Sequence, residues 1–373
     1  MKTNEILSNR SVRIGLVVAL VLLLGSVPVL AYFAFQVYGQ PLGPALSGLA
    51  PSAAANTAAA PVDNTTAALA TTNQTAGEAA SNPSANPSAV LADNNTTSPQ
   101  VNTTEVCGEK GVWNLLILGS DTGETGFLSG SDLTRAAQVD FSNKKVTIYA
   151  FPRDLWVKTT DVGFTNPAID FARLSEVFKE ARSRSKQTNL QGQMSDGANA
   201  TAIVMAQNFN LHFDHYLAVD LAQLPAMVDA IGGVTMNVPN RTTDKWIGMV
   251  IQEGQQTLNG EQAAAFARAK PDSDFGRIVR DNLLMDAMRQ KLSDPALWVK
   301  IPQLYSQFKD VIATDLSPSQ IIDLGCMMKS TPKESILQDA VNAKWTKAGP
   351  QESLLWDSSK VSARLKELGL TQQ

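Results

Sequence analysis

Long apolar and polar stretches alternate along this chain of 373 residues and divide it into segments. Residues 14–38 contain no charged side chain and are long enough to span a hydrocarbon core of about 30 Å. Residues 39–105 consist mainly of Ala, Asn, Thr, Ser and Pro, and they offer too few apolar side chains to bury a core. The pattern predicts a transmembrane anchor at 14–38, a disordered linker at 39–105 and a folded domain at 106–373.

Apolar runs and alternating patterns predict the strands of this domain. The stretch VWNLLILG at 112–119 is an apolar run of the kind found in strands that are buried on both faces. Residues 136–152 read as two strands around an SNKK turn, and residues 215–220 and 234–238 read as two more strands.

Apolar residues at helical spacing predict the helices. The first is expected at 169–182, with Phe171, Leu174, Phe178 and Ala181 on one face. Further helices are expected at residues 199–209, 222–233, 273–292 and 317–328. Residues 185–197 read as a mobile loop between helices. The irregular alternation predicts an α/β domain, with a mixed central β-sheet and helices on both faces.

The distribution of charge predicts where each segment lies. Lys2, Arg10 and Arg13 precede the apolar segment, and the next charge after it is Asp63. The positive-inside rule therefore places residues 1–13 in the cytoplasm and the domain outside a cell membrane that the chain crosses once. A cleaved signal peptide is the alternative, although its apolar core is usually shorter, about 7–15 residues. The net charge of −4 and the lack of long basic runs argue against nucleic-acid binding.

The chain has two cysteines, Cys107 before the first predicted strand and Cys326 in the last apolar helix. Outside the membrane such a pair can be oxidised, and a disulfide would join the two ends of the domain. We favour a disulfide over two free thiols. Two cysteines this far apart form no zinc-binding pattern.

Two aspartates stand at predicted strand ends, Asp121 in LGSD and Asp132 in SGSD. Carboxylates at neighbouring strand ends can share a hard divalent cation such as Mg²⁺. They can equally be turn residues that bond to local backbone N–H groups. Neither a Walker A motif nor a dinucleotide-binding fingerprint is present.

Basic residues occur at two places that suit anion binding. Arg153 follows the hairpin at PRD, where it could bind phosphate or simply pair with Asp154. The stretch ARAKPDSDFGRIVRDN at 267–282 concentrates charge: Arg268 and Lys270 alternate as on a strand, just before a helix N-terminus that attracts anions. The alternative is a solvated helix face held by ion pairs between residues three and four apart.

In their order along the chain, these segments resemble the LytR-CpsA-Psr family of extracytoplasmic envelope enzymes. The matching stretches lie within residues 112–330 and read NLLILGSD, GSDLT, VTIYAFPRDLWV, FDHYLAVDLAQLPAMVDAIGGVTMNV and FARAKPDSDFGRIVRDN. Such enzymes transfer a glycopolymer, as a sugar phosphate, from a polyprenyl pyrophosphate carrier to a hydroxyl of peptidoglycan. The resemblance implies this phosphotransfer, with that donor and a peptidoglycan or other wall acceptor as partners.

The resemblance also implies roles for particular residues. Asp121 and Asp132 correspond to the ligands of Mg²⁺ (or Mn²⁺), and the lipid tail would lie in an apolar tunnel. The implied catalytic residues are Asp121, Asp132, Arg153 and Arg277, and the implied substrate-binding residues are Arg268, Lys270, Asp274, Arg280 and Asp281. Ile278, Met285 and Met288 form a stripe that could line the tunnel, although we favour ordinary core for them.

Four positions depart from the family pattern and reduce the positive charge of the implied pocket. Gly130 stands where the family has Arg, Lys270 and Asp281 replace Arg and Gln, and the family's Lys before Asn166 is missing. Arg135 is near, but on a regular strand that begins at Asp132 it points to the opposite face. The departures keep two alternatives to a transferase open: a non-catalytic module that binds polyprenyl or glycan phosphates, and a lipid pyrophosphatase.

Overall fold

The computed structural model describes residues 39–47, 107–121, 130–162, 170–269, 274–291, 294–348 and 351–371. The predicted membrane anchor and most of the predicted linker lie outside these ranges. No helix within the described ranges is long and apolar enough to cross a membrane.

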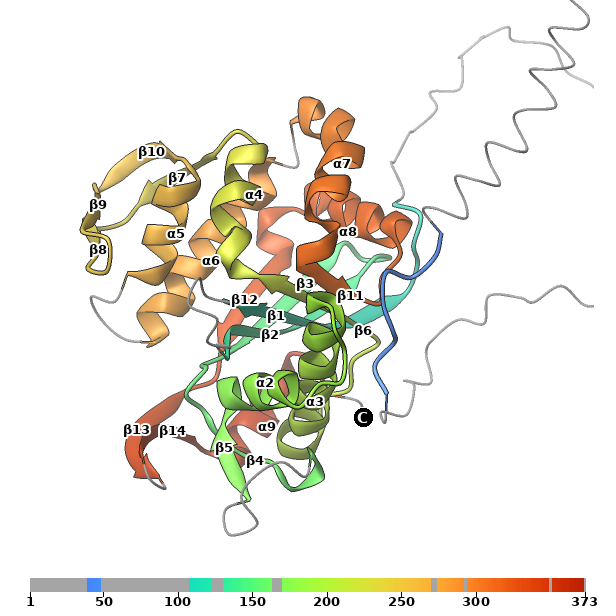
Figure 1. The fold of residues 1–373 in the computed structure, drawn as a ribbon, viewed down its shortest axis with the longest axis vertical. Helices are drawn as coiled ribbons and strands as arrows, with labels where there is room; N and C mark the ends of the chain where they lie inside the picture. The colour runs from blue at the N-terminus through green and yellow to red at the C-terminus, as the bar shows by residue number, and fades with distance from the viewer. Residues whose placement is uncertain are drawn as a thin grey trace, which may run out of the picture. The chain divides into compact units, whose positions relative to one another are not determined.

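A six-stranded mixed sheet with helices on both faces forms the centre of the domain, as predicted (Figure 1). The strand order is β11-β6-β1-β2-β3-β12; β6 runs parallel to β1, β12 runs parallel to β3, and the other neighbours are antiparallel. The strands of the sheet are β1 (Val112–Ser120), β2 (Ser131–Asp140), β3 (Lys145–Phe151), β6 (His215–Asp220), β11 (Ile312–Thr314) and β12 (Ile336–Ala340).

Within the described ranges, four strand pairs and eight α-helices surround this sheet. The pairs are β4 (Trp156–Lys158) with β5 (Phe171–Arg173), β7 (Val234–Val238) with β10 (Gly254–Leu258), β8 (Thr242–Asp244) with β9 (Met249–Ile251), and β13 (Ala343–Ala348) with β14 (Gln351–Trp356). The α-helices are α2 (Leu174–Ser183), α3 (Leu190–Phe209), α4 (Leu224–Ala230), α5 (Gly260–Arg268), α6 (Asp274–Lys291), α7 (Pro295–Phe308), α8 (Pro318–Ser330) and α9 (Ser358–Glu367). The short 3-10 helices are η2 (Thr160–Val162), η3 (Leu221–Gln223), η4 (Lys309–Val311) and η5 (Lys333–Ser335).

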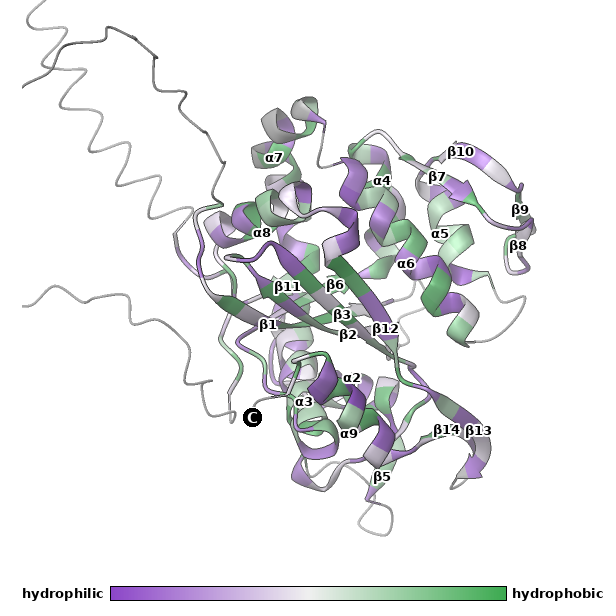
Figure 2. Ribbon diagram, turned by 180° about the vertical axis from the view of Figure 1, so that it is seen from behind, coloured by the Kyte–Doolittle hydropathy of each residue, from purple (hydrophilic) through white to green (hydrophobic). Residues whose placement is uncertain are grey.

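The apolar run of β1 is explained by burial on both faces. Leu116 and Leu118 pack in a cluster with residues of α2, α3 and α9. Trp113 and Leu115, on the alternate positions, pack in a second cluster with residues of α8. Figure 2 shows the hydrophobic strand segments enclosed between these two helix layers. A third cluster joins α4, α5 and α6 to the strands β7, β9 and β10.

Two predictions for the region between β3 and β6 are wrong. Phe171 lies on strand β5, where its ring stacks on Trp156, and helix α2 begins only at Leu174. The expected loop at 185–197 is mostly helical, because α3 already begins at Leu190. The first turns of α3 are polar and contain two glycines, a composition that is typical of loops. Gly197 is needed there for close packing, since a Cβ at this position would lie 2.7 Å from the Phe178 ring.

Residues 39–47, which the sequence pattern assigned to the linker, lie against the domain. The backbone N–H of Leu42 donates to the Leu316 carbonyl at 3.1 Å, and that of Ser47 donates to Asn199 Oδ1 at 2.8 Å. Leu46 packs against the core cluster on the α3 side of the sheet. The part of the predicted linker that is described therefore covers the domain next to the edge strand β11.

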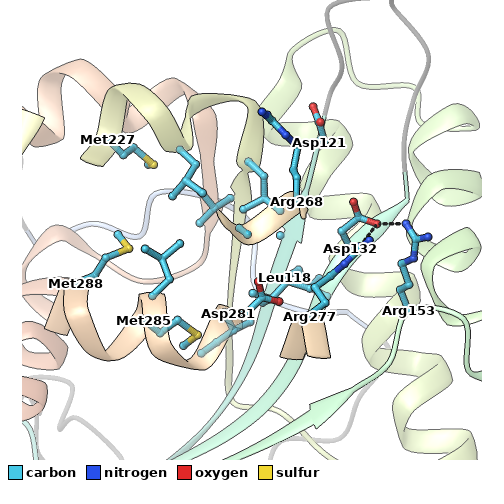
Figure 3. A pocket seen from close by; sticks show the side chains of 18 of the residues that line it. Leu118, Asp121, Asp132, Arg153, Met227, Arg268, Arg277, Asp281, Met285 and Met288 are labelled. Carbon is cyan, nitrogen blue, oxygen red and sulfur yellow. Dashed lines mark hydrogen bonds and ion pairs between the residues drawn. The ribbon is translucent and has the colours of Figure 1, made fainter. Parts of the chain in front are cut away.

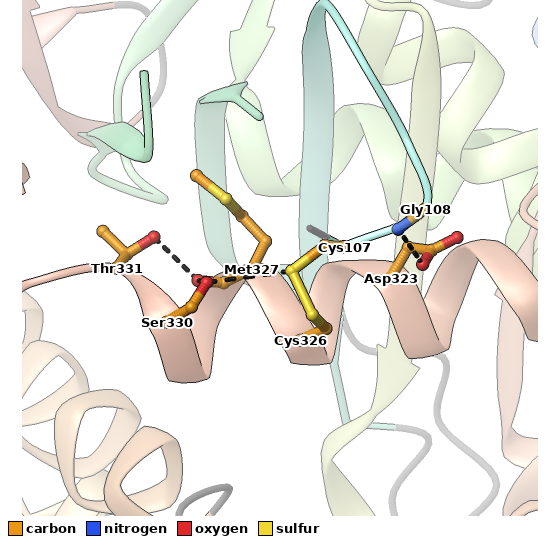
Figure 4. Close-up of a disulfide and its surroundings, with 7 residues drawn as sticks. All are labelled: Cys107, Gly108, Asp323, Cys326, Met327, Ser330 and Thr331. Carbon is orange, nitrogen blue, oxygen red and sulfur yellow. Dashed lines mark hydrogen bonds between the residues drawn. A yellow bond between two sulfur atoms is a disulfide. The ribbon is translucent and has the colours of Figure 1, made fainter. Parts of the chain in front are cut away.

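A disulfide joins Cys107, just before β1, to Cys326 on α8 (Figure 4). The two Cα atoms lie 5.7 Å apart and 219 residues separate the cysteines in sequence. The adjacent N–H of Gly108 donates to Asp323 Oδ1 at 2.9 Å, a second link between the same segments.

Replacing both cysteines by serine is expected to lower the free energy of unfolding by about 3–5 kcal/mol, because the bridge restricts a long loop of the unfolded chain. Urea denaturation of the two proteins measures the difference. Dithiothreitol should destabilise the wild type and leave the double variant unchanged. An equal response of both proteins would show that the thiols are free in the purified protein.

Candidate functional site

A cavity of about 650 Å³ lies between helices α4 and α6 and the face of the sheet that they cover. Side chains from β1, β6, η3, α4 and α6 make one end apolar. The apolar lining includes Ile117, Leu118, Leu217, Val219, Leu221, Leu224, Met227, Leu284, Met285 and Met288. This size and lining are typical of pockets that enclose small organic or lipid ligands.

Met285 and Met288 lie on this cavity wall and also pack against the hydrophobic clusters behind it, so both interpretations of their stripe hold. Ile278, from the same stripe, is buried with 7% of its surface exposed and is not among the lining residues described. Helical spacing alone could not separate the two cases, because core and tunnel walls both require an apolar helix face.

The opposite end of the cavity is charged. Figure 3 shows Asp121, Asp132, Arg153 and Arg277 gathered away from the methionines, with Asp281 beside Arg277. These side chains come from the ends of β1 and β3, from β2 and from the first turns of α6. The sequence segments that were predicted to form one site are therefore brought together in space.

Asp132 lies between two of the predicted arginines. Its Oδ1 accepts a hydrogen bond from Arg153 Nη1 at 2.8 Å and lies 3.6 Å from Arg277 Nη1. Arg153 also reaches Asp154, with Nε 3.3 Å from Oδ2. Arg153 therefore pairs with its neighbour and also lines the pocket, while phosphate binding by Arg153 stays a prediction. Arg277 is 12% exposed, so it belongs to the pocket wall and not to a solvated helix face.

A β-bulge in β2 places Asp132 in the pocket. Gly119 pairs with Leu133 and Ser120 pairs with Ser131, so Asp132 is an extra residue without a partner in the ladder. Asp132 and Leu133 both line the cavity, and Arg135 reaches Asp281 of α6 on the same side of the sheet. The prediction that Arg135 points away from the Asp132 side is thus wrong, because the extra residue shifts the alternation by one.

Asp281 has an unusual environment for a carboxylate. Burial raises its pKa to about 6, although the nearby guanidinium groups of Arg135, Arg277 and Arg280 oppose that shift. The closest of these contacts is Arg135 Nη2 to Asp281 Oδ2, at 3.6 Å. Burial in turn lowers the pKa of Arg135, whose side chain is 1% exposed.

The raised pKa of Asp281 predicts a pH-dependent stability. An acid whose pKa is 3.8 when unfolded and about 6 when folded binds more protons in the folded state between those values. The wild type should therefore lose stability relative to Asp281→Asn as the pH rises from 4 to 6, by about 2 kcal/mol. Urea denaturation across this range tests it. A constant difference between the two proteins would contradict a raised pKa.

Arg268 contributes to the pocket from a helix and not from the predicted strand. It is the last residue of α5, and its Nε lies 3.1 Å from Oδ2 of the buried Asp244. Asp244 was not predicted from the sequence, because an aspartate at the end of the short TTD strand has no motif that marks it as a pocket residue. Lys270 and the side chain of Asp274 lie outside the described residues.

Arg280 has a different position from the one predicted. Its side chain is buried with 5% exposed, is not among the residues that line the described cavity, and donates a hydrogen bond to the Ala269 carbonyl. That carbonyl directly follows Arg268 in the chain. Arg280 therefore ties the end of α5 to α6 and helps to fix the wall of the pocket from behind.

The carboxylates of Asp121 and Asp132 offer hard oxygen ligands, as Mg²⁺ or Mn²⁺ requires. Among the described residues there is no group of three or more acidic, histidine or cysteine side chains that could hold a metal ion alone. Mg²⁺ is usually held by one or two carboxylates, with substrate phosphates and water completing its shell. The donor set therefore fits a cation that arrives with a phosphorylated substrate.

Fold and site together define a class of protein: a mixed-sheet α/β domain whose apolar pocket ends in a rim of aspartates and arginines. The model of the LytR_cpsA_psr family matches residues 67–367, and the chain belongs to this family. The resemblance seen in the sequence motifs is thereby confirmed.

Individual relatives are more distant. The chain is 27% identical over 211 residues to the Enterococcus faecalis protein named polyisoprenyl-teichoic acid–peptidoglycan teichoic acid transferase TagU; the match covers 55% of this chain and 62% of that protein. It is 24% identical to the regulatory protein MsrR of Staphylococcus aureus, over 57% of this chain and 58% of the relative. The chain thus spans about three fifths of the length of these relatives.

Solved structures share the fold. Bacillus subtilis TagV superposes with a TM-score of 0.57 at 19% identity, covering 71% of this chain and all of the TagV chain. A structure titled TagT bound to LIIa-WTA superposes with a TM-score of 0.53 at 19% identity, over 69% of this chain and 90% of the other.

Proposed function

We propose that this protein transfers a glycopolymer, as a sugar phosphate, from a polyprenyl pyrophosphate carrier to a hydroxyl of peptidoglycan or another wall polymer. One observation carries the proposal: a single cavity joins an apolar end to a rim of aspartates and arginines. A polyprenyl pyrophosphate has the same division, with a hydrocarbon chain attached to a doubly charged head group. The name of the TagU relative, a teichoic acid transferase, supports this substrate class.

The transfer breaks one bond of the pyrophosphate and forms one bond to the acceptor. The acceptor oxygen attacks the phosphorus that carries the sugar, and the bridging P–O bond breaks to release polyprenyl phosphate. Arg153 and Arg277 face this position and would stabilise the negative charge that develops on the leaving phosphate. The proton of the acceptor hydroxyl would pass to a carboxylate at the rim, Asp121 or Asp132.

We propose that Asp121 and Asp132 hold Mg²⁺, or Mn²⁺, during this reaction. Bound there, the cation would polarise the phosphoryl oxygens and neutralise part of their charge. Asp132 also pairs with Arg153 and Arg277, which keeps both arginines directed at the rim.

The apolar segment 14–38 would hold the protein in the cell membrane, with the domain on the outer side. A polyprenyl carrier is itself membrane-bound, so a membrane anchor keeps the enzyme beside its donor. This location would also provide the oxidising surroundings in which a structural disulfide persists.

Full-length protein in detergent, a polyprenyl-pyrophosphate-linked glycan and Mg²⁺ would test the function, with and without peptidoglycan. Release of polyprenyl phosphate only when the acceptor is present supports transfer. Release without acceptor would identify a lipid pyrophosphatase. Donor binding without turnover in either condition would contradict the proposal of an enzyme and favour a non-catalytic binding module. The departures from the family pattern at Gly130 and Asp281 are compatible with such a module.

Filling the apolar end should separate lipid binding from head-group binding. Met288→Trp is expected to weaken binding of the polyprenyl donor by about tenfold or more, because the larger ring occupies space that the chain needs. Binding of inorganic pyrophosphate, measured by calorimetry, should stay unchanged. Val279→Trp is the matched control, since Val279 is 56% exposed on the same helix. Equal donor affinity in all three proteins would contradict lipid binding in this cavity.

A further inference from the structure

Arg135 is a buried cation with few partners. Its side chain is 1% exposed, and Nη1 donates a long hydrogen bond of 3.4 Å to the Thr134 carbonyl. Within the described part of the chain, Nε and Nη2 have no hydrogen-bond partner, and the one ion pair of Arg135 is to Asp281, at 3.6 Å. A guanidinium held this way costs considerable desolvation energy, and an apolar side chain of similar size often stabilises a fold at least as well. Stability therefore does not explain why Arg135 is there.

The partner of Arg135 stands on the wall of the anion pocket. Asp281 lines the cavity, one helical turn after Arg277 and near Asp132. A carboxylate beside a pyrophosphate site repels the ligand, with an energy that depends on how well the carboxylate is neutralised. Among the charged groups near Asp281, Arg277 already faces Asp132 and Arg280 bonds to the Ala269 carbonyl. Arg135 remains as the cation directed to Asp281 alone.

Gly130, where the family pattern has Arg, leaves no room for a side chain. A Cβ atom at Gly130 would lie 2.4 Å from the Ser175 carbonyl oxygen of α2, so no side chain fits there without a shift of the backbone. The bulge at Asp132 turns Arg135 to the pocket side of the sheet. The same local geometry thus excludes a side chain at 130 and brings a guanidinium under the pocket floor.

We propose that Arg135 is a positioning residue that acts through Asp281: it neutralises this carboxylate and holds it against the sheet, and so sets how strongly the pocket binds a pyrophosphate head group. The inference rests on the proposed function, because it presumes a pyrophosphate ligand. Arg135 itself lies beneath the wall and needs no contact with the ligand. Without it, Asp281 would present an uncompensated negative charge to the site.

Binding of inorganic pyrophosphate to the full-length protein, at constant Mg²⁺ and about pH 8, tests this charge balance; Asp281 is ionised there. Arg135→Met should weaken binding roughly tenfold, since it leaves the acid unpaired, and Asp281→Asn should strengthen it roughly tenfold, since it leaves the cation unpaired. The double variant should bind within about threefold of the wild type. Arg135→Lys, which keeps the charge, should do the same.

Opposite shifts in affinity cannot come from a merely structural pair, because a disordered pocket wall would weaken pyrophosphate binding in both single variants. If both weaken pyrophosphate binding, or neither changes it, the inference is overturned. If Arg135→Met does not fold, the comparison of Asp281→Asn with the double variant still shows whether removing the Arg135 charge weakens pyrophosphate binding. A wild type that binds no pyrophosphate at all would instead overturn the proposed function.

Discussion

Arg277→Ala is expected to reduce the proposed transfer by about 10²–10³-fold while the domain stays folded, because the lost guanidinium lines the pocket where it would stabilise the phosphate that gains charge. The effect on stability should stay below about 1 kcal/mol, since Asp132 is 33% exposed and keeps its shorter contact to Arg153. Polyprenyl phosphate release measures the rate, and a thermal melt measures the stability.

Arg289→Ala is the matched control for this substitution. Arg289 lies on the same helix, is 15% exposed and pairs with Asp286 at 3.1 Å, so it resembles Arg277 in burial and pairing but lies away from the charged rim. Its replacement should leave transfer within about twofold of the wild type and cost less than about 1 kcal/mol of stability. If Arg277→Ala behaves like Arg289→Ala, Arg277 serves only as an ion-pair partner of Asp132, and a role in anion binding is contradicted.

The sheet and the positions of the first site residues could be predicted because they follow from local pattern. An apolar run without a polar face requires burial on both sides, which fixes β1 at the centre of the sheet. Strand ends then place Asp121 and Arg153 at one edge. Even so, the pattern alone could not choose between turn residues and a binding rim, because that choice depends on which edges the topology brings together.

The remaining features depend on single residues whose effect is not periodic. One extra residue at Asp132 moves Arg135 to the other face, and no composition rule signals a bulge there. Gly197 looks like a loop residue but serves close packing of α3 on Phe178. Arg268 and Asp244 meet only because the end of α5 lies beside β8. These contacts are decided by tertiary structure, which local propensity does not describe.

Asp132→Asn is expected to reduce Mg²⁺-dependent transfer by at least about 100-fold, since the amide keeps the shape of the side chain but loses the charge that would hold the cation. The same loss of charge weakens the contacts to Arg153 and Arg277. Transfer measured across a Mg²⁺ titration should show both a lower maximum and a higher Mg²⁺ requirement. Asp140→Asn, at the end of the same strand, should leave both unchanged, because Asp140 accepts only turn hydrogen bonds from Asn143 among the contacts described.

The Mg²⁺ titration distinguishes the two roles that Asp132 can have. If the residue holds the cation, more Mg²⁺ should recover part of the lost rate, because occupancy of the weakened site rises with concentration. If its role is only to direct the two arginines, the Mg²⁺ requirement should stay that of the wild type while the KM for the donor increases. The second result would contradict a metal site at Asp132 and leave it as the residue that orients Arg153 and Arg277.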